Sequence, residues 1–204
     1  MKALLVVDLQ LDFLPDGALA VKEGDLIIPS INAIQNRFDL VVATQDWHPL
    51  DHQSFASQHP NQQQFDVVTL HGIPQVLWPD HCVQGTVGAT FSEAWDSTVV
   101  SAVFRKGMNK QIDSYSGFYD NNKMDSTGLL GFLKDKKVTE VYVCGLAAEY
   151  CVFYTAMDAK KAGFDTFFLD FATKPISKEN LQQAKKTLIE NEIVIVNTSE
   201  ELKV

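Results

Sequence analysis

Cysteine is scarce in this sequence. Only three cysteines occur among 204 residues, and no two of them form a CxxC pair. An odd, widely spaced set argues against a disulfide framework and suits reduced thiols in a reducing compartment. At least one thiol is therefore a candidate for chemistry; the three are Cys82, Cys144 and Cys151.

Long apolar runs are also missing. No segment approaches the roughly 20 apolar residues that a membrane-spanning helix needs, so we expect no membrane role. Met1 leads into the short run LLVV, but Asp8 interrupts it and no small-residue cleavage site follows. We interpret this run as a strand and not as a signal peptide, and we expect a cytoplasmic protein.

Positive charge is sparse, with 17 Lys and Arg against 26 Asp and Glu and a net charge of -9. Binding to nucleic acid depends on clustered Lys and Arg, so we expect no such partner. A small neutral or cationic ligand fits the charge better. The length favours one domain over residues 1–204, and the sequence does not decide between a monomer and a homo-oligomer.

Six short runs rich in Val, Ile and Phe are apolar throughout and do not alternate. This is typical of parallel strands that are covered on both faces. Segments with helical spacing lie between several of them. The order predicts an α/β fold, a doubly wound, mostly parallel six-stranded sheet with right-handed crossovers and helices on both faces. The predicted strands are 3–8, 40–44, 100–104, 141–145, 165–170 and 193–197.

Four helices are predicted between these strands. The first begins near Pro29, the second contains 129–133, the third covers about 149–161, and Ser177 is a good N-cap for the fourth. The segment at about 47–97 shows no sustained periodicity. A long irregular excursion in a compact domain is usually functional or misassigned, and the histidines and tryptophan here favour function.

Polar side chains follow four of the predicted strands where each strand ends. They are Asp8, the pair Asp46 and His48, Lys106, and Cys151. In open parallel sheets, ligands bind beyond the carboxyl ends of the strands. We therefore expect these residues to converge on one crevice.

Cys151 lies six residues past the 141–145 strand, where the next helix begins. The helix dipole and free backbone N–H groups would lower the pKa of a thiol there and could form an oxyanion hole. Lys106 could pair with Asp8, keep it ionised and add positive charge near the thiol. The competing interpretations are that Cys151 only packs the helix, that Asp8 is a turn residue and that Lys106 is a solvated loop lysine. For Cys144 and Cys82 we favour a packing role.

Asp46 and His48 are two residues apart, so in an extended chain both side chains point the same way. With a third ligand they would form an open catalytic site for Zn²⁺ or a similar ion. Spacing alone does not choose the third ligand; the candidates are His52, His59, His71 and His81.

The motifs together resemble a known family. The segments LLVVDLQLDF, TQDWHP, WPDHCVQGT, FRKG, YSGF and VCGLAAEYCV are similar to those of the nicotinamidases in the isochorismatase-like cysteine hydrolase superfamily. DLQ.DF and GLA..YC are shared across the superfamily, whereas DWHP followed by WP.HCV..T is particular to nicotinamidases. The resemblance covers essentially the whole chain.

The resemblance implies a catalytic triad, one divalent metal ion and an aromatic pocket for a flat pyridine ring. The ion would be Zn²⁺, with Fe or Mn as alternatives. A cis peptide bond between Leu146 and Ala147 would aim backbone N–H groups of Ala147 and Cys151 at the substrate oxygen. The implied triad is Asp8, Lys106 and Cys151; the ligands are Asp46, His48 and His81, with His52 near a further ligand of some relatives; the ring walls are Phe13, Trp78 and Tyr115.

The implied reaction is hydrolysis of nicotinamide to nicotinic acid and ammonia through a Cys151 thioester, a step in NAD salvage. One alternative is a related cysteine hydrolase acting on another small amide or an N-carbamoyl compound. Another is a non-catalytic ligand-binding protein on the same fold. The chain departs from many relatives at Ala148 and Glu149, where they often have Thr and Asp, so a hydrogen bond at that turn is lost or rerouted.

Overall fold

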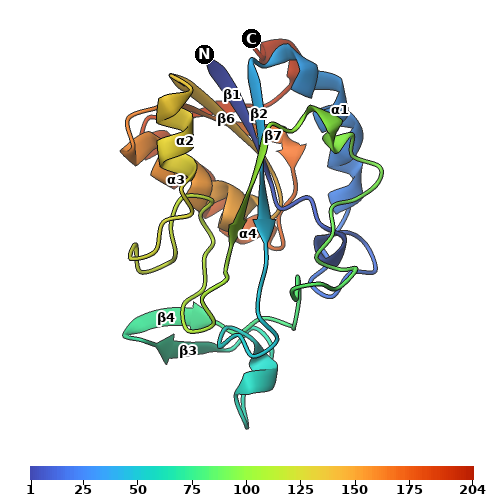
Figure 1. Cartoon of the computed structure of the whole chain (residues 1–204), viewed down its shortest axis with the longest axis vertical. Coiled ribbons are helices and arrows are strands. Elements are labelled where there is room, and N and C mark those ends of the chain that lie inside the picture. Colours follow the sequence, from blue (N-terminus) through green and yellow to red (C-terminus); the bar gives the residue numbers. More distant parts are fainter.

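A six-stranded sheet forms the centre of the molecule in a computed structural model that describes residues 1–204 (Figure 1). Every pairing in this sheet is parallel, and the strand order is β5-β2-β1-β6-β7-β8. The order reverses direction between β1 and β6, which places a crevice at their carboxyl ends. The strands are β1 (Lys2–Val7), β2 (Leu40–Asp46), β5 (Ala102–Lys106), β6 (Glu140–Gly145), β7 (Asp165–Thr173) and β8 (Val194–Val196).

Helices cover both faces of the sheet, so the predicted doubly wound fold is confirmed. Figure 1 shows α1 (Ile28–Ile34) on one side and α2 (Leu129–Asp135) and α3 (Phe153–Lys161) on the other. The last helix, α4 (Lys178–Glu190), shares the hydrophobic cluster of α2 and α3. Ser177 caps α4 as predicted, since its hydroxyl accepts the Asn180 N–H at 3.2 Å.

The two-sided burial explains why the strand sequences are apolar throughout. In β1, Leu4 and Val6 belong to the cluster under α1, whereas Leu5 and Val7 belong to the cluster under the other three helices. All four side chains are fully buried. Successive strand residues face opposite sides, so a strand covered on both sides needs apolar residues at every position.

The segment at 47–97 is less irregular than expected. It contains an antiparallel hairpin of β3 (Val67–Leu70) and β4 (Ile73–Val76), which lies beyond the carboxyl ends of the sheet strands (Figure 1). His71 and Gly72 form the two-residue turn, both with positive φ, as a type I′ turn requires. All but one of the residues in the two hairpin strands are exposed or only partly buried, so no strong apolar pattern marks the hairpin in the sequence.

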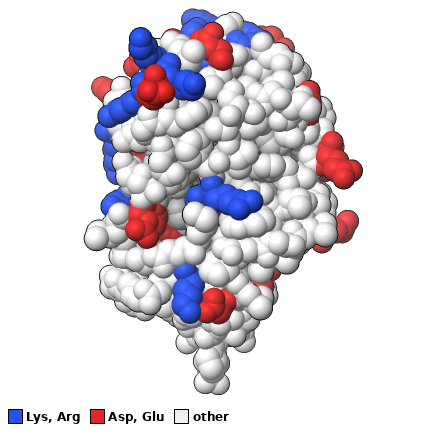
Figure 2. Space-filling view, in the orientation of Figure 1, with Lys and Arg blue, Asp and Glu red and all other residues white.

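The surface carries both signs of charge. On the face in Figure 2, most of the Lys and Arg side chains lie at the upper left, with acidic side chains among them, and much of the remaining face is uncharged. As for membranes, no helix here combines the length and the hydrophobicity that a crossing would require.

Candidate active site

Lys106 lies at the centre of a buried cluster made by four strand ends. Its ammonium nitrogen is 2.9 Å from Asp8 Oδ2, 3.0 Å from Asp46 Oδ1 and 3.4 Å from Cys151 Sγ. It also donates to the Ser114 carbonyl at 2.9 Å. Burial acts to lower the pKa of Lys106, but the neighbouring carboxylates raise it well above its usual value. The ammonium therefore stays charged, and the expected convergence on one crevice is present.

Asp8 directly follows β1 and is fully buried. The Thr44 hydroxyl donates to its Oδ1 at 2.7 Å. Burial raises the pKa of Asp8, Lys106 lowers it, and the charge of Asp46 raises it further, so the net direction is upward. The expected effect of Lys106 on Asp8 is thus present but smaller than the cost of burying the charge. A raised pKa makes this carboxylate a stronger proton acceptor.

Cys151 lies in a π-helical turn, Ala148–Val152, that leads into α3. Burial raises the pKa of its thiol well above the usual range; Lys106 lowers it, whereas Asp8 and Asp46 raise it. The prediction of a lowered thiol pKa is therefore wrong. The sulfur is buried beside two carboxylates, and their combined effect on the pKa exceeds that of the lysine. The resting thiol keeps its proton and needs a base to become a nucleophile.

A set of metal-type donors lies next to this cluster. Asp46 Oδ2 is 3.2 Å from His48 Nε2 and 3.5 Å from His81 Nε2. Each imidazole donates its Nδ1–H to a backbone carbonyl, His48 to Gly107 at 2.9 Å and His81 to Pro79 at 2.7 Å. These hydrogen bonds leave the Nε2 lone pairs directed at Asp46, the usual arrangement around a ligating histidine.

The buried Nε2 of His48 has no hydrogen-bond partner, which is rare unless another group completes the site. Gly107 has φ +67°, and a Cβ there would collide with the His48 ring and the Asp46 carboxylate. Asp46, His48 and His81 together form a buried one-carboxylate, two-imidazole set. This donor set fits a divalent metal ion of the borderline type, with positions left open.

His52 is buried next to this set, and its ring centroid is 4.4 Å from that of His48. The backbone N–H of Ser54 donates to its Nδ1 at 3.1 Å. Its Nε2 is buried without a hydrogen-bond partner, and with His48 and Asp113 it makes a second group of possible metal donors. A role for His52 as a ligand stays a prediction. His59 is bonded to the Gln53 carbonyl, and neither His59 nor His71 belongs to a candidate metal group.

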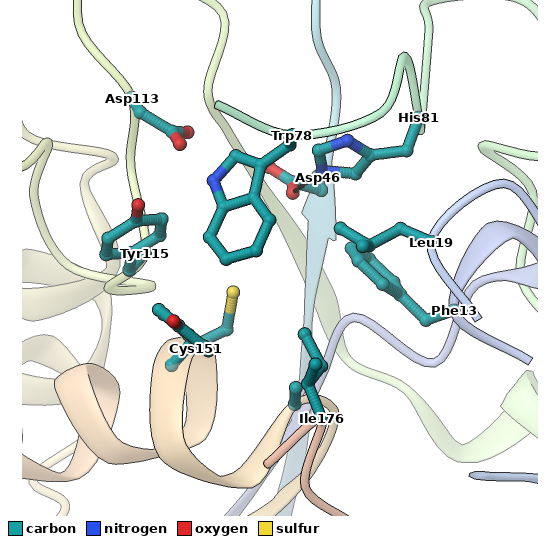
Figure 3. Close-up of a pocket in the computed structure, with 11 residues that line it drawn as sticks. Phe13, Leu19, Asp46, Trp78, His81, Asp113, Tyr115, Cys151 and Ile176 are labelled. Atoms are coloured by element: carbon teal, nitrogen blue, oxygen red, sulfur yellow. Dashed lines mark ion pairs between the residues drawn. The ribbon is translucent and has the colours of Figure 1, made fainter. Parts of the chain in front are cut away.

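A pocket with a mostly apolar lining lies above the thiol. The indole of Trp78 meets Tyr115 edge-on at 6.2 Å and Tyr150 at 4.9 Å between ring centroids. Figure 3 shows Cys151 Sγ directed into the space beside Trp78, with Phe13 on the opposite wall. All four residues expected around the substrate line the pocket: Phe13, Trp78, Tyr115 and Ala147.

Four lining residues were not predicted: Leu19, Asp113, Tyr150 and Ile176. Leu19 and Ile176 are single apolar residues in loops, and nothing in the sequence distinguishes them from core residues. Tyr150 directly precedes Cys151 and could have been found from that proximity. The peptide between Leu146 and Ala147 is cis, as the resemblance implies.

The family model of the isochorismatase domain matches residues 2–201. The chain belongs to the isochorismatase family. The resemblance given by the sequence motifs is therefore confirmed, and the α/β fold is the one that members of this family share with it.

Individual members are closely similar over most of the chain. A nicotinamidase of Acinetobacter baylyi is 46% identical over 188 residues, which are 92% of this chain and 88% of that protein. The structure of an Acinetobacter baumanii nicotinamidase and pyrazinamidase superposes with a TM-score of 0.96 at 43% identity, covering 98% of each chain. A pyrazinamidase of Pyrococcus horikoshii, solved in complex with zinc, has a TM-score of 0.78 at 38% identity and covers 97% of this chain and 99% of its own.

Proposed function

We propose that this protein is a nicotinamidase, which hydrolyses the carboxamide of nicotinamide to nicotinic acid and ammonia in NAD salvage. The observation that carries the proposal is that two buried clusters, the one around Lys106 and the set of metal-type donors, meet below one aromatic pocket. Asp46 belongs to both, since it contacts Lys106 beside the thiol and His48 in the donor set. The nicotinamidase relatives support the same reaction.

The catalytic steps follow from the positions of Asp8 and Cys151. Asp8 takes the thiol proton, and the thiolate attacks the carboxamide carbon. The backbone N–H groups of Ala147 and Cys151 stabilise the oxyanion as it develops. Asp8 returns the proton to the departing ammonia, which leaves a thioester on Cys151. Asp8 then deprotonates a water that attacks the thioester, releases nicotinic acid and restores the thiol.

Lys106 balances the charge of this machinery. Two carboxylates, Asp8 and Asp46, lie within 3.0 Å of its ammonium in a region closed to solvent. A buried charge without a partner costs several kcal/mol, so the lysine allows both carboxylates to stay ionised together. It also stabilises the thiolate when it forms, because it contacts the sulfur at 3.4 Å.

We further propose that Asp46, His48 and His81 hold one divalent metal ion, with Zn²⁺ the first candidate because a relative is solved with zinc. When bound, such an ion supplies a Lewis acid that binds and orients a substrate nitrogen or water. Phe13, Trp78 and Tyr115 hold the flat ring by packing against its faces and edges. This protein is proposed to act in the cytoplasm.

The direct test is ammonia release from purified protein. We expect release from nicotinamide with production of nicotinic acid, and metal in a stoichiometric amount. An N-carbamoyl amino acid tested in parallel separates the nearest alternative, a hydrolase of ureido compounds. Ammonia from the carbamoyl compound and none from nicotinamide would reject the proposal.

Replacing His48 with Ala should remove most of the bound metal. Loss of a hydrogen bond that supports a ligand lowers metal affinity roughly 10–100-fold, and loss of the ligand itself should lower it further. Elemental analysis after dialysis, and a titration with Zn²⁺, measure the change. His71→Ala is the matched control, because His71 lies in the hairpin turn and outside the donor set. Equal metal content in the two variants would contradict the assigned site.

A further inference from the structure

Glu149 joins the nucleophile turn to a second wall of the pocket. Its side chain is largely buried, and it precedes Cys151 by two residues. We infer that Glu149 is a positioning residue that holds Ile176 against the substrate, an inference that rests on the proposed function. Its two side-chain partners are the N–H groups of Ile176 and Ser177, in the segment 174–177 between β7 and α4.

Three hydrogen bonds connect the turn to this segment. Glu149 Oε1 accepts the Ser177 N–H at 2.6 Å, and Oε2 accepts the Ile176 N–H at 3.2 Å. The Ala148 N–H donates to the Lys174 carbonyl at 2.9 Å. The loop that carries Ile176 is therefore bound to the same turn that carries Cys151. Burial raises the pKa of Glu149 above its usual value, although the N–H groups of Ser177 and Ile176 act to lower it.

Ile176 needs this support because packing holds its side chain only in part. The residue is 37% exposed, yet it lines the pocket together with Cys151 and Phe13. Figure 3 shows it directed toward the pocket at the edge nearest the thiol. An apolar wall residue at a pocket edge, with little core contact, takes its position from its backbone. That backbone is fixed by the Glu149 carboxylate.

A carboxylate suits this role better than an amide. The N–H groups of Ile176 and Ser177 each donate to a different oxygen of the Glu149 carboxylate. Both hydrogen bonds form only if both oxygens can accept. A glutamine offers one acceptor, and its NH₂ group would face the other N–H. The donors also lie at the start of α4, where the helix dipole favours a negative charge. Glu149→Gln therefore loosens one of the two contacts without changing the size of the side chain.

The test is a double-mutant cycle with Glu149→Gln, Ile176→Ala and the double variant. We expect either single change to raise the KM for nicotinamide and the Kd for nicotinic acid by roughly fivefold to tenfold, with kcat within about twofold of wild type. The double variant should have the same KM and Kd as Ile176→Ala. Once the Ile176 side chain is removed, the position of its loop no longer affects the pyridine ring. Glu179→Gln is the control; this exposed residue bonds only the Ser177 hydroxyl and lies outside the pocket.

Several results would overturn the inference. One is an unchanged KM and Kd in Glu149→Gln. Another is a KM in the double variant that equals the product of the two single effects. The third is a loss confined to kcat, which would place Glu149 at the nucleophile only. A lower unfolding midpoint with normal KM would likewise reduce it to a structural residue. If Glu149→Gln does not fold, Glu149→Asp, which keeps the charge but shortens the reach, carries the same expectation. If the wild-type protein releases no ammonia from nicotinamide, the proposed function itself is rejected. If the wild type is active but the effects of the Glu149 and Ile176 substitutions are independent, only this inference is rejected.

Discussion

Replacing Cys151 with Ala should abolish ammonia release from nicotinamide, by about 10⁴-fold or more in kcat, because no other group can form the thioester. The thiol is the one cysteine sulfur in the pocket, 3.4 Å from Lys106. Removing it leaves the metal donors and aromatic walls in place. The variant should therefore still bind nicotinic acid and retain its metal. Ammonia assay, binding titration and elemental analysis on the same preparation check the three expectations.

Cys144→Ala is the matched control for this prediction. Cys144 is fully buried within β6, and the only hydrogen bond of its sulfur is to the Leu5 carbonyl, at 3.7 Å. Its pKa is raised by burial alone, which makes it chemically inert. We expect near-normal kcat with a stability loss of about 1 kcal/mol. Activity in Cys151→Ala similar to that of the control would remove the thioester from the mechanism.

Replacing Lys106 with Met should have the second largest effect, on both activity and stability. The change leaves Asp8 and Asp46 facing each other in a site closed to solvent, without the cation that contacts both. Breaking a buried ion pair by removing one partner costs about 3–5 kcal/mol. The pKa of Asp8 should rise further, since its main opposing influence is lost, and kcat should fall roughly 10³-fold. Urea unfolding and steady-state kinetics measure the two effects.

Lys110→Met separates this buried pair from an ordinary surface pair. Lys110 bonds Asp51 at 2.7 Å, but both side chains are more than half exposed. Solvent screens such pairs, so the expected stability change is below about 1 kcal/mol and kcat should not change. If Lys106→Met were as stable and as active as Lys110→Met, the central role of the buried ammonium would be wrong.

The strands could be predicted because a strand buried on both faces has apolar residues at successive positions, and this pattern is visible in the sequence. Every position of β1 that packs against α1 or against the other helices is apolar, and the run ends where Asp8 meets the crevice. The hairpin of β3 and β4 was missed for the opposite reason. Its side chains are partly solvated, so its register depends on the turn at His71 and Gly72 more than on an apolar pattern.

The motifs identify the residues of the site, but they do not reveal the pKa values of those residues. The sequence shows a cysteine at the start of a helix and a lysine after a strand, which favour a low thiol pKa. It does not show that Cys151 is almost closed to solvent with two carboxylates beside it. Desolvation depends on everything packed around a group, and that includes residues from four strands that are distant in the chain.

The amino-acid sequence by itself determined the α/β class, the strand-end positions of the reactive residues and, through its motifs, the family. These are local properties, since apolar periodicity and short motifs depend on neighbouring residues. Only the tertiary structure decided which groups touch. It showed Lys106 between Asp8 and Asp46, the ring of His81 beside the Asp46 carboxylate, and the Glu149 side chain bonded to the loop of Ile176. Contacts of this kind arise from the packing of distant segments, so their distances and their effects on pKa exist only in the folded chain.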